Sequence, residues 1–290
     1  MNDLRAVLAD RFEIGAHPLR FQGMAERVPG IYDLSFINRS GEPVSGVLCR
    51  PDRPGRTPVV LYLHAHGNRY HIGATELLDG RPALHGALGP MLAAQGIASV
   101  CLDMPCFGGR AGVTESAAAK AALWRGGSLA GQMLGESAAL LDWLCAQDWV
   151  DPARIGGFGI SMGATLGTWL AAVDSRICAL VQECCLADFA VLIDEGGHDL
   201  HGIYLTVPGL LCIAANGEIA GLVAPRAQFI GIGDLDPLTP ARAVAVALGQ
   251  VQAGYVAGGR LVVHREATSG HVETPAMRAA ALAFLVRELG

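Results

Sequence analysis

Lysine is almost absent from this sequence, and several larger signals are absent with it. Lys120 is the only lysine, so arginine carries nearly all of the positive charge. Charged residues make up 17% of the chain and the net charge is -6, which excludes the basic surface typical of nucleic-acid binding. No apolar run is long enough to span a bilayer, and the first residues lack the apolar core of a secretory signal. We therefore expect a cytoplasmic protein that binds neither nucleic acid nor a membrane.

Cysteine occurs eight times, but without the spacing of a disulfide framework or a zinc site. Several of these cysteines lie in apolar, strand-like segments, which is typical of small buried hydrophobic residues in a reducing compartment. The H-x-H spacing of His64 and His66, with His71 nearby, would place metal ligands on one face of a strand. No CxxC or HExxH motif accompanies them, so metal binding is the weaker interpretation, and we expect neither a metal nor another cofactor.

The pattern of apolar residues predicts an α/β fold. A chain of 290 residues, 51% of them hydrophobic, can bury one large core. Early hairpins followed by β-α alternation predict a mainly parallel, eight-stranded sheet with helices on both faces. The expected strands lie near residues 31–38, 43–50, 58–64, 97–103, 155–160, 178–183, 227–233 and 260–264.

The expected organisation is a single domain with one insertion. Residues 1–30 are expected to form a helical and loop lead-in, and residues 31–290 the domain. The long piece after the sixth strand, at about 186–226, is expected to be a lid-like insertion over the C-terminal edge of the sheet.

The most informative motif is Gly159-Ile160-Ser161-Met162-Gly163, a match to G-x-S-x-G. A strand-like stretch precedes it, and a helical rhythm of small residues with spaced Leu and Trp follows it. A serine at such a junction sits in a strained turn, and the two glycines remove the collisions that side chains would make there. A glycine-rich joint that merely allows close packing is the alternative. The context favours a nucleophile elbow, with the Ser161 hydroxyl beside a helix N-terminus.

A serine nucleophile needs a base, and the base needs an acid that orients it. In sheet enzymes of this type the chain order is serine, acid, histidine. Asp234 and Asp236 both follow a buried strand, and Asp236 fits the position of a loop acid better, whereas Asp234 could cap or stabilise the turn. His271 lies in a Gly-containing loop past the last strand and is the expected base, while His264 lies within that strand.

The loop after the strand at 58–64 is expected to supply an oxyanion hole. Gly67 allows a tight turn, so the N–H of Asn68 can point at the carbonyl oxygen of a substrate. The second donor would be the N–H of Met162, the residue after the candidate nucleophile.

Four further residues are candidates for contact with a substrate. His66 lies in the expected oxyanion loop, and His201 lies in the expected insertion. Phe107 and Tyr204 are candidate pocket walls, and ordinary core packing is the equal alternative for both of them.

These pieces together resemble the α/β-hydrolase superfamily, from about Ile31 to the C-terminus. Within it, the chain is most similar to bacterial dienelactone hydrolase-like and acetyl-xylan-esterase-like proteins. The resemblance implies Ser161, Asp236 and His271 as a catalytic triad, with the N–H groups of Asn68 and Met162 as the oxyanion hole. The dienelactone hydrolases proper use a cysteine nucleophile, so serine at position 161 favours a general ester hydrolase. Beside these sites, the resemblance rests on the segments Ile31–Phe36, Gly46–Pro51, His66–Asn68 and Asp103–Gly109.

We therefore expect a serine hydrolase that cleaves small-molecule carboxylic esters through an acyl-enzyme intermediate. A peptidase or amidase with the same triad is the nearest alternative. A non-catalytic binding protein of the same fold is a third, although such proteins often lose a triad member and all three are present here. Acyl length, leaving group and oligomeric state are open at this stage, including whether the chain forms a homo-oligomer.

Overall fold

The computed structural model describes residues 2–290, with side chains from Leu4 onward. The strands are β1 (Leu19–Val28), β2 (Ile31–Asn38), β3 (Pro43–Cys49), β4 (Thr57–Leu63), β5 (Ala98–Leu102), β6 (Val150–Ile160), β7 (Ile177–Glu183), β8 (Ala227–Gly233) and β9 (Leu261–Glu266). The α-helices are α1 (Asn2–Arg11), α2 (Glu76–Asp79), α3 (Leu88–Ala94), α4 (Glu115–Trp124), α5 (Leu129–Cys145), α6 (Met162–Val173), α7 (Phe189–Asp194), α8 (Asn216–Gly221), α9 (Ala241–Gly254) and α10 (Pro275–Leu289). Short 3-10 helices are η1 (Gly108–Arg110), η2 (Gly197–Leu200), η3 (Ile203–Leu205) and η4 (Leu210–Cys212).

The strands form a single mixed sheet in which the later part is parallel. Its order is β1-β2-β3-β5-β4-β6-β7-β8-β9. β1, β2, β3 and β5 pair antiparallel to one another, and every pairing from β5 through β4 to β9 is parallel. Because parallel strands end at the same edge, the loops that follow β4, β6, β7, β8 and β9 share the C-terminal edge of the sheet.

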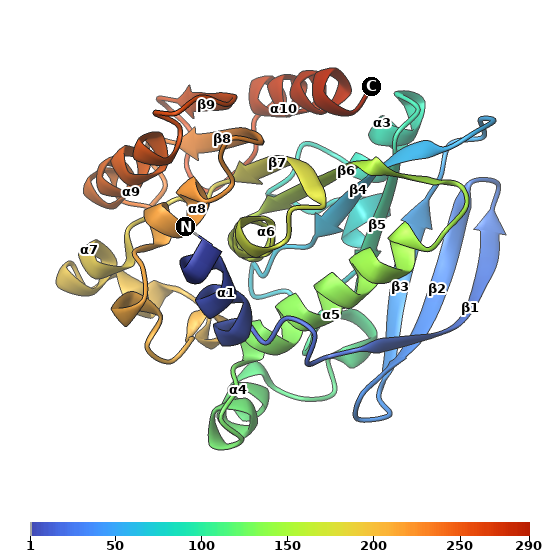
Figure 1. Ribbon diagram of the computed structural model, residues 1–290, viewed down its shortest axis with the longest axis horizontal. Helices are drawn as coiled ribbons and strands as arrows, with labels where there is room; N and C mark the ends of the chain where they lie inside the picture. Colours follow the sequence, from blue (N-terminus) through green and yellow to red (C-terminus); the bar gives the residue numbers. More distant parts are fainter. Residues whose placement is uncertain (1) are drawn as a thin grey trace.

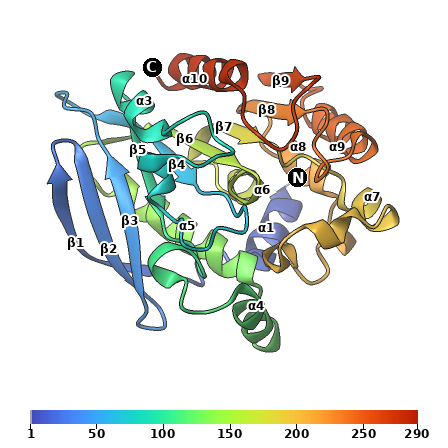
Figure 2. The same ribbon diagram turned by 180° about the vertical axis from the view of Figure 1, so that it is seen from behind.

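Helices cover both faces of this sheet (Figures 1 and 2). On β4, Leu61 and Leu63 belong to the core cluster that includes Trp169 of α6, whereas Val60 and Tyr62 belong to a second cluster with α3 and α10. Successive side chains of a strand point to opposite faces, so α6 lies on one face and α3 and α10 on the other. α1 and α5 pack against α6 and thicken its layer. The expected α/β architecture with helices on both faces is confirmed.

The number of strands was predicted wrongly, as eight instead of nine. The additional strand is β1, which lies inside the expected lead-in of residues 1–30 and pairs with β2 at the sheet edge. Its side chains are mostly exposed, and its register is irregular between Phe21 and Gly23. An exposed, interrupted edge strand lacks the alternation of apolar residues that identifies a strand in sequence.

The segment expected as an insertion, about 186–226, lies between β7 and β8. β7 is the strand expected near 178–183, which was the sixth in a count that lacked β1. It contains α7, the 3-10 helices η2, η3 and η4, and α8. η3 packs against both α4 and α5, so the segment is anchored to the helical layer that also contains α6.

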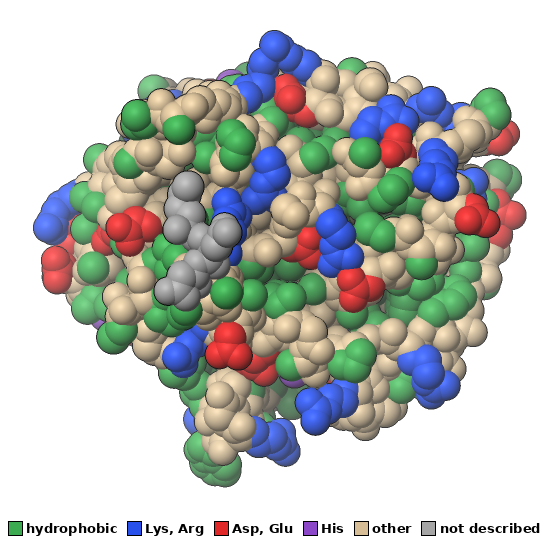
Figure 3. Space-filling view, in the orientation of Figure 1, with side chains coloured by type: hydrophobic (Ala, Val, Ile, Leu, Met, Phe, Trp, Pro, Cys, Tyr) green, Lys and Arg blue, Asp and Glu red, His purple; other side chains and the backbone are tan. Residues whose placement is uncertain are grey.

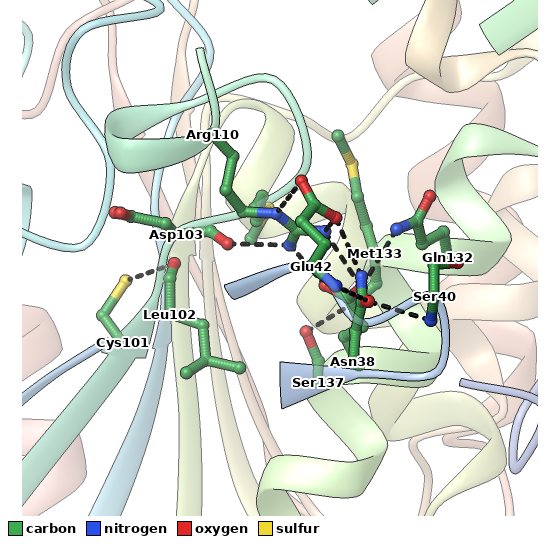
Figure 4. A network of polar contacts seen from close by, with 12 residues as sticks. Asn38, Ser40, Glu42, Cys101, Leu102, Asp103, Arg110, Gln132, Met133 and Ser137 are labelled. Atoms are coloured by element: carbon green, nitrogen blue, oxygen red, sulfur yellow. Dashed lines mark hydrogen bonds and ion pairs between the residues drawn. The ribbon is translucent and has the colours of Figure 1, made fainter. Parts of the chain in front are cut away.

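A buried ion-pair network joins the β2–β3 hairpin to η1 and α5 (Figure 4). The guanidinium of Arg110 lies 2.5 Å from Glu136 and 2.6 Å from Glu42, and the side-chain amide of Asn38 donates to both carboxylates. Burial lowers the pKa of Arg110, but the hydrogen bonds to Glu42 and Glu136 outweigh it and raise the pKa above its ordinary value. Arg110 and Glu136 are 2% and 3% exposed, so each neutralises a charge that water does not reach.

The face of the molecule in Figure 3 shows no strong patch of one sign. Basic and acidic side chains are interspersed over the face in Figure 3. No helix within residues 2–290 has both the length and the apolar character that crossing a membrane requires.

The network around Arg110 gives a stability prediction. Arg110→Met leaves Glu136 as a buried charge without its cation, so the free energy of unfolding should fall by about 3–5 kcal/mol. Arg27→Met removes the exposed pair with Asp33 and should cost at most about 1 kcal/mol. Urea unfolding followed by circular dichroism measures both. Equal losses in the two variants would show that the buried network contributes nothing special.

Candidate active site

Ser161 occupies a strained turn between the end of β6 and the start of α6. Its φ is 56° and its ψ is -122°, a backbone conformation that L residues rarely adopt. A Cβ at Gly159 would overlap the backbone of Gly163, and a Cβ at Gly163 would overlap the carbonyl oxygen of Leu63. The N–H of Ser161 donates to the carbonyl oxygen of Glu183 at 2.9 Å. Sterics at two glycines and one cross-strand hydrogen bond therefore hold the serine at the C-terminal edge.

The structure brings Ser161, His271 and Asp236 into one chain of hydrogen bonds. Nε2 of His271 lies 2.9 Å from Oγ of Ser161, and Nδ1 of His271 lies 2.7 Å from Oδ2 of Asp236. The Asp236 side chain is fully buried, whereas His271 is 23% exposed. The N–H of Leu238 donates to Oδ1 of Asp236 at 2.9 Å, which fixes the carboxylate on its other side. This geometry matches a nucleophile, a base and an orienting acid.

The loops that carry Asp236 and His271 are joined by their backbones. The N–H of Leu235 donates to the carbonyl oxygen of Ser269, and a Cβ at Gly233 would overlap the carbonyl oxygens of the His271 loop. Asp234, the competing aspartate, instead faces solvent and pairs with Arg265 at 2.6 Å. Of the two aspartates, only Asp236 reaches His271.

The two expected oxyanion donors, the N–H groups of Met162 and Asn68, lie in different surroundings. Met162 is the first residue of α6, and the first N–H groups of a helix have no acceptor within the helix. The N–H of Asn68 donates to Nδ1 of His66 at 3.1 Å. Gly67 and Asn68 both have positive φ, 51° and 54°, so the loop turns as tightly as expected. An oxyanion at Asn68 would have to share or replace the hydrogen bond to His66.

His66 belongs to a buried cluster that the sequence did not reveal. Its Nε2 lies 2.8 Å from Glu115, the first residue of α4. The same carboxylate accepts the Tyr70 hydroxyl at 2.7 Å and the Tyr204 N–H at 2.8 Å. Burial raises the pKa of Glu115, but the hydrogen bonds from His66, Tyr70 and Tyr204 outweigh it and leave the pKa below its ordinary value. Because Nδ1 of His66 accepts and Nε2 faces a carboxylate, the ring carries its proton on Nε2.

The aromatic candidates pack around His66. The rings of Tyr204 and Phe107 lie with their centroids 5.6 Å and 5.2 Å from that of His66. Phe107 is fully buried and Tyr204 is 4% exposed, so both side chains support the oxyanion loop from inside. His201 lies in the wall of a cavity of about 530 Å³ within the insertion, and its Nε2 donates to the carbonyl oxygen of Leu238, two residues after Asp236.

The histidines considered as metal ligands do not converge. His64 is fully buried; its Nε2 accepts the N–H of Met104, and burial lowers its pKa to about 3. His66 is held by Glu115, and His71 is exposed. Among the side chains that the structure describes, none of these three belongs to a group with the spacing of a metal site.

A small cavity of about 120 Å³ opens between Ser161 and the oxyanion loop. Arg81 packs behind Gly67, where its guanidinium forms a buried ion pair with Glu76. Glu76 also accepts the N–H of Ala65 at 3.0 Å, so this pair supports the start of the loop. The residues that line the cavity are Ala65, Gly67, Arg69, Arg81, Pro82, Ala83, Ile160, Ser161 and His271.

Glu115 and Glu76 were missed because no sequence signal singles them out. Glu115 follows Thr114, whose side chain accepts from the N–H of Ala117 and caps α4. A Thr-Glu pair before a run of alanines indicates a helix start and nothing more. The contact between Glu115 and His66 joins residues 49 positions apart, which only the tertiary fold determines.

Comparisons with known proteins agree with this fold. Residues 41–215 match the family described as X-Pro dipeptidyl-peptidase (S15 family). The chain is 34% identical over 287 residues to YtaP of Bacillus subtilis (strain 168), a protein that is named as a proposed hydrolase. The match covers 97% of this chain and 95% of that protein.

Solved structures of similar fold include two acetyl xylan esterases. The enzyme from Paenibacillus sp. R4 has a TM-score of 0.71 at 19% identity, covering 100% of this chain and 95% of that one. Acetyl xylan esterase 1 from Thermoanaerobacterium sp. JW/SL YS485 has a TM-score of 0.67 at 18% identity, covering 100% and 93%. The chain therefore has the α/β-hydrolase fold and belongs to the X-Pro dipeptidyl-peptidase (S15) family.

Proposed function

We propose that the protein hydrolyses carboxylic esters, with Ser161 as nucleophile, His271 as base and Asp236 as orienting acid. The observation that carries this proposal is the unbroken chain of hydrogen bonds from Ser161 through His271 to the buried Asp236, at 2.9 Å and 2.7 Å. A non-catalytic protein of the same fold has no need to keep this geometry or the strained backbone of Ser161.

The reaction proceeds through an acyl-enzyme. Oγ of Ser161 attacks the ester carbonyl while Nε2 of His271 takes its proton and then delivers that proton to the leaving alkoxide. Asp236 keeps the proton of the neutral ring on Nδ1 and stabilises the ring when it is charged. Water activated by the same nitrogen then attacks the acyl-enzyme and releases the acid.

The N–H groups of Met162 and Asn68 stabilise the oxyanion. Met162 supplies a helix-terminal N–H next to the nucleophile. Asn68 supplies its N–H once the oxyanion competes with Nδ1 of His66, the acceptor in the unliganded site. Glu115 then acts through His66 as a positioning residue for this loop. The insertion at about 186–226 acts as a lid-like segment, because the N–H of its Tyr204 donates to the same carboxylate.

The charge of the cavity favours an ester over an N-terminal X-Pro peptide. A dipeptidyl-peptidase must accommodate the ammonium group of its substrate, which needs a carboxylate or another acceptor nearby. Among the described residues, the charged ones that line the cavity beside Ser161 are Arg69 and Arg81, and no Asp or Glu lines it. Arg69 is exposed and would repel an ammonium group. The family name therefore does not fix the substrate.

The size of the cavity favours a short acyl group. Its volume of about 120 Å³ lies well below the range of about 300–1,000 Å³ that is typical of ligand pockets. Acetyl xylan esterases are among the structures of similar fold, in line with a small acyl group. A cytoplasmic location is part of the proposal, since all eight cysteines are free thiols.

Replacement of the nucleophile tests the proposed mechanism. Ser161→Ala should lower kcat for p-nitrophenyl acetate by about four to six orders of magnitude, because no other described residue that lines the cavity carries a hydroxyl or thiol. Ser40→Ala, which changes an exposed serine in the β2–β3 turn that does not line the cavity beside Ser161, should keep the wild-type rate. A Ser161→Ala enzyme with near-normal turnover would refute the mechanism.

A substrate panel tests the ester and the acyl length together. We expect kcat/KM to fall by about tenfold or more from p-nitrophenyl acetate to the octanoate, because the longer chain does not fit the cavity. An Xaa-Pro p-nitroanilide should be cleaved at least about a thousandfold more slowly than the acetate. Faster cleavage of the anilide would instead establish the peptidase.

Glu115 should affect turnover more than substrate binding. Glu115→Ala removes the acceptor that orients His66, so kcat should fall by about 10- to 100-fold with KM little changed. Glu115→Gln keeps an acceptor oxygen and should recover part of this loss. Glu195→Gln, an exposed change in the insertion, is the control. If kcat of Glu115→Ala matches the control while thermal unfolding shows an intact fold, Glu115 does not position the loop.

A further inference from the structure

A cysteine that the proposed chemistry does not use lies against the acid and the base of the site. Cys184 follows β7 directly and has a φ of 51°. Its N–H donates to the carbonyl oxygen of Gly231 at 2.9 Å, which ties it to the end of β8. Cys184 is 2% exposed and Asp236 is 3% exposed. The thiol therefore lies inside the same edge of the sheet that carries the site.

Three potential metal-ligand atoms lie close together on the side chains of Cys184, Asp236 and His271. The sulfur, a carboxylate oxygen and a ring nitrogen all lie within 4.8 Å of one another. Among the described side chains, this is the single group of three or more His, Cys, Asp or Glu residues with such spacing. Thiolate, imidazole and carboxylate are the ligands that Zn²⁺ prefers, bound at about 2.0–2.3 Å. Zn²⁺ would take three corners of a tetrahedral site from this group, with water as the fourth ligand. Two ligands at about 2.0 Å from a tetrahedral ion lie about 3.3 Å apart, so Nδ1 of His271 and the Asp236 carboxylate, now 2.7 Å apart, would separate slightly to admit the ion.

We propose that Zn²⁺ binds between Cys184 Sγ, the Asp236 carboxylate and His271 Nδ1, and that the bound ion inhibits hydrolysis. The ring nitrogen is Nδ1 because this atom faces Asp236 at 2.7 Å, whereas Nε2 faces Ser161 at 2.9 Å. The ion replaces the hydrogen bond between His271 and Asp236. The sequence led us to expect no metal, because it contains no metal-binding motif. The three ligands of the proposed site are distant in sequence, and only the fold brings them together.

Inhibition by the ion follows from the chemistry of the His271 ring and rests on the proposed ester hydrolysis. A neutral imidazole that binds a metal through Nδ1 carries its proton on Nε2. That nitrogen then donates to Ser161 and cannot accept the serine proton. The protons balance: the thiol of Cys184 loses one to solvent as the zinc–sulfur bond forms, and the ring proton of His271 moves from Nδ1 to Nε2. The ion therefore lowers kcat without occupying the cavity beside Ser161.

The first experiment measures metal binding without reference to activity. Protein treated with a chelator is titrated with Co²⁺, which replaces Zn²⁺ and gives a thiolate-to-cobalt charge-transfer band in the near ultraviolet. Wild-type protein should show the band, Cys184→Ser should lack it, and Cys185→Ser should keep it, since Cys185 lies outside the group. Ser161→Ala should keep it as well. A band that survives in folded Cys184→Ser, or none in the wild type, overturns the site.

The second experiment measures inhibition by Zn²⁺ with p-nitrophenyl acetate, each variant relative to its own uninhibited rate. The wild type and Cys185→Ser should be inhibited alike, and a chelator should restore both rates. Cys184→Ser and Cys184→Ala should need about tenfold more Zn²⁺ or more for the same inhibition. Equal inhibition of Cys184 variants and wild type overturns the proposal. If the wild type hydrolyses no ester, the proposed function fails, while the cobalt band still decides the metal site.

Discussion

The close approach of helix α6 to the end of strand β4 is the constraint on which the rest of the site depends. The backbone of Gly163 lies so near the carbonyl oxygens of Leu63 and His64 that a Cβ has no room. This contact brings the start of α6 to the loop that follows β4. Ser161 must then turn with positive φ between β6 and α6, and its hydroxyl shares a small cavity with Gly67. This one close contact therefore determines the positions of Ser161, of the helix-terminal N–H of Met162 and of the cavity.

Buried charges support the loops around this turn. Glu76 accepts the N–H of Ala65 and pairs with Arg81 under Gly67, while Glu115 fixes His66 and binds the insertion at Tyr204. A buried ion pair contributes little net stability, because desolvation offsets its attraction. Here the buried carboxylates mainly fix the geometry of the loops. Each carboxylate accepts hydrogen bonds from loop residues that have no partner strand in the sheet.

The sequence predicted the parts of the site that lie within a few residues of a strand end. The G-x-S-x-G motif located Ser161, and the ends of two expected strands located Asp236 and His271, because parallel strands deliver their ends to one edge. A helix was expected directly after the G-x-S-x-G motif, and α6 begins at Met162. The edge strand β1 was missed because it is exposed and irregular.

Contacts between distant segments could not be predicted from one sequence. Glu115 reaches His66 from the start of α4, and the N–H of Asn68 faces His66 instead of open space. Cys184 was one of several apolar-segment cysteines until the fold set it beside Asp236. In each case the sequence shows an ordinary residue in an ordinary element, and its role depends on packing between elements that no local pattern records.

The proposed mechanism requires a covalent acyl-enzyme on Ser161, which rapid-quench mass spectrometry can detect. Enzyme mixed with excess p-nitrophenyl acetate is quenched in acid within the first turnover, digested and analysed. The peptide containing Ser161 should gain the mass of one acetyl group, and no other peptide should do so to the same extent. An unmodified Ser161 peptide during active turnover, or an acetyl group on a different residue, would contradict the proposed mechanism.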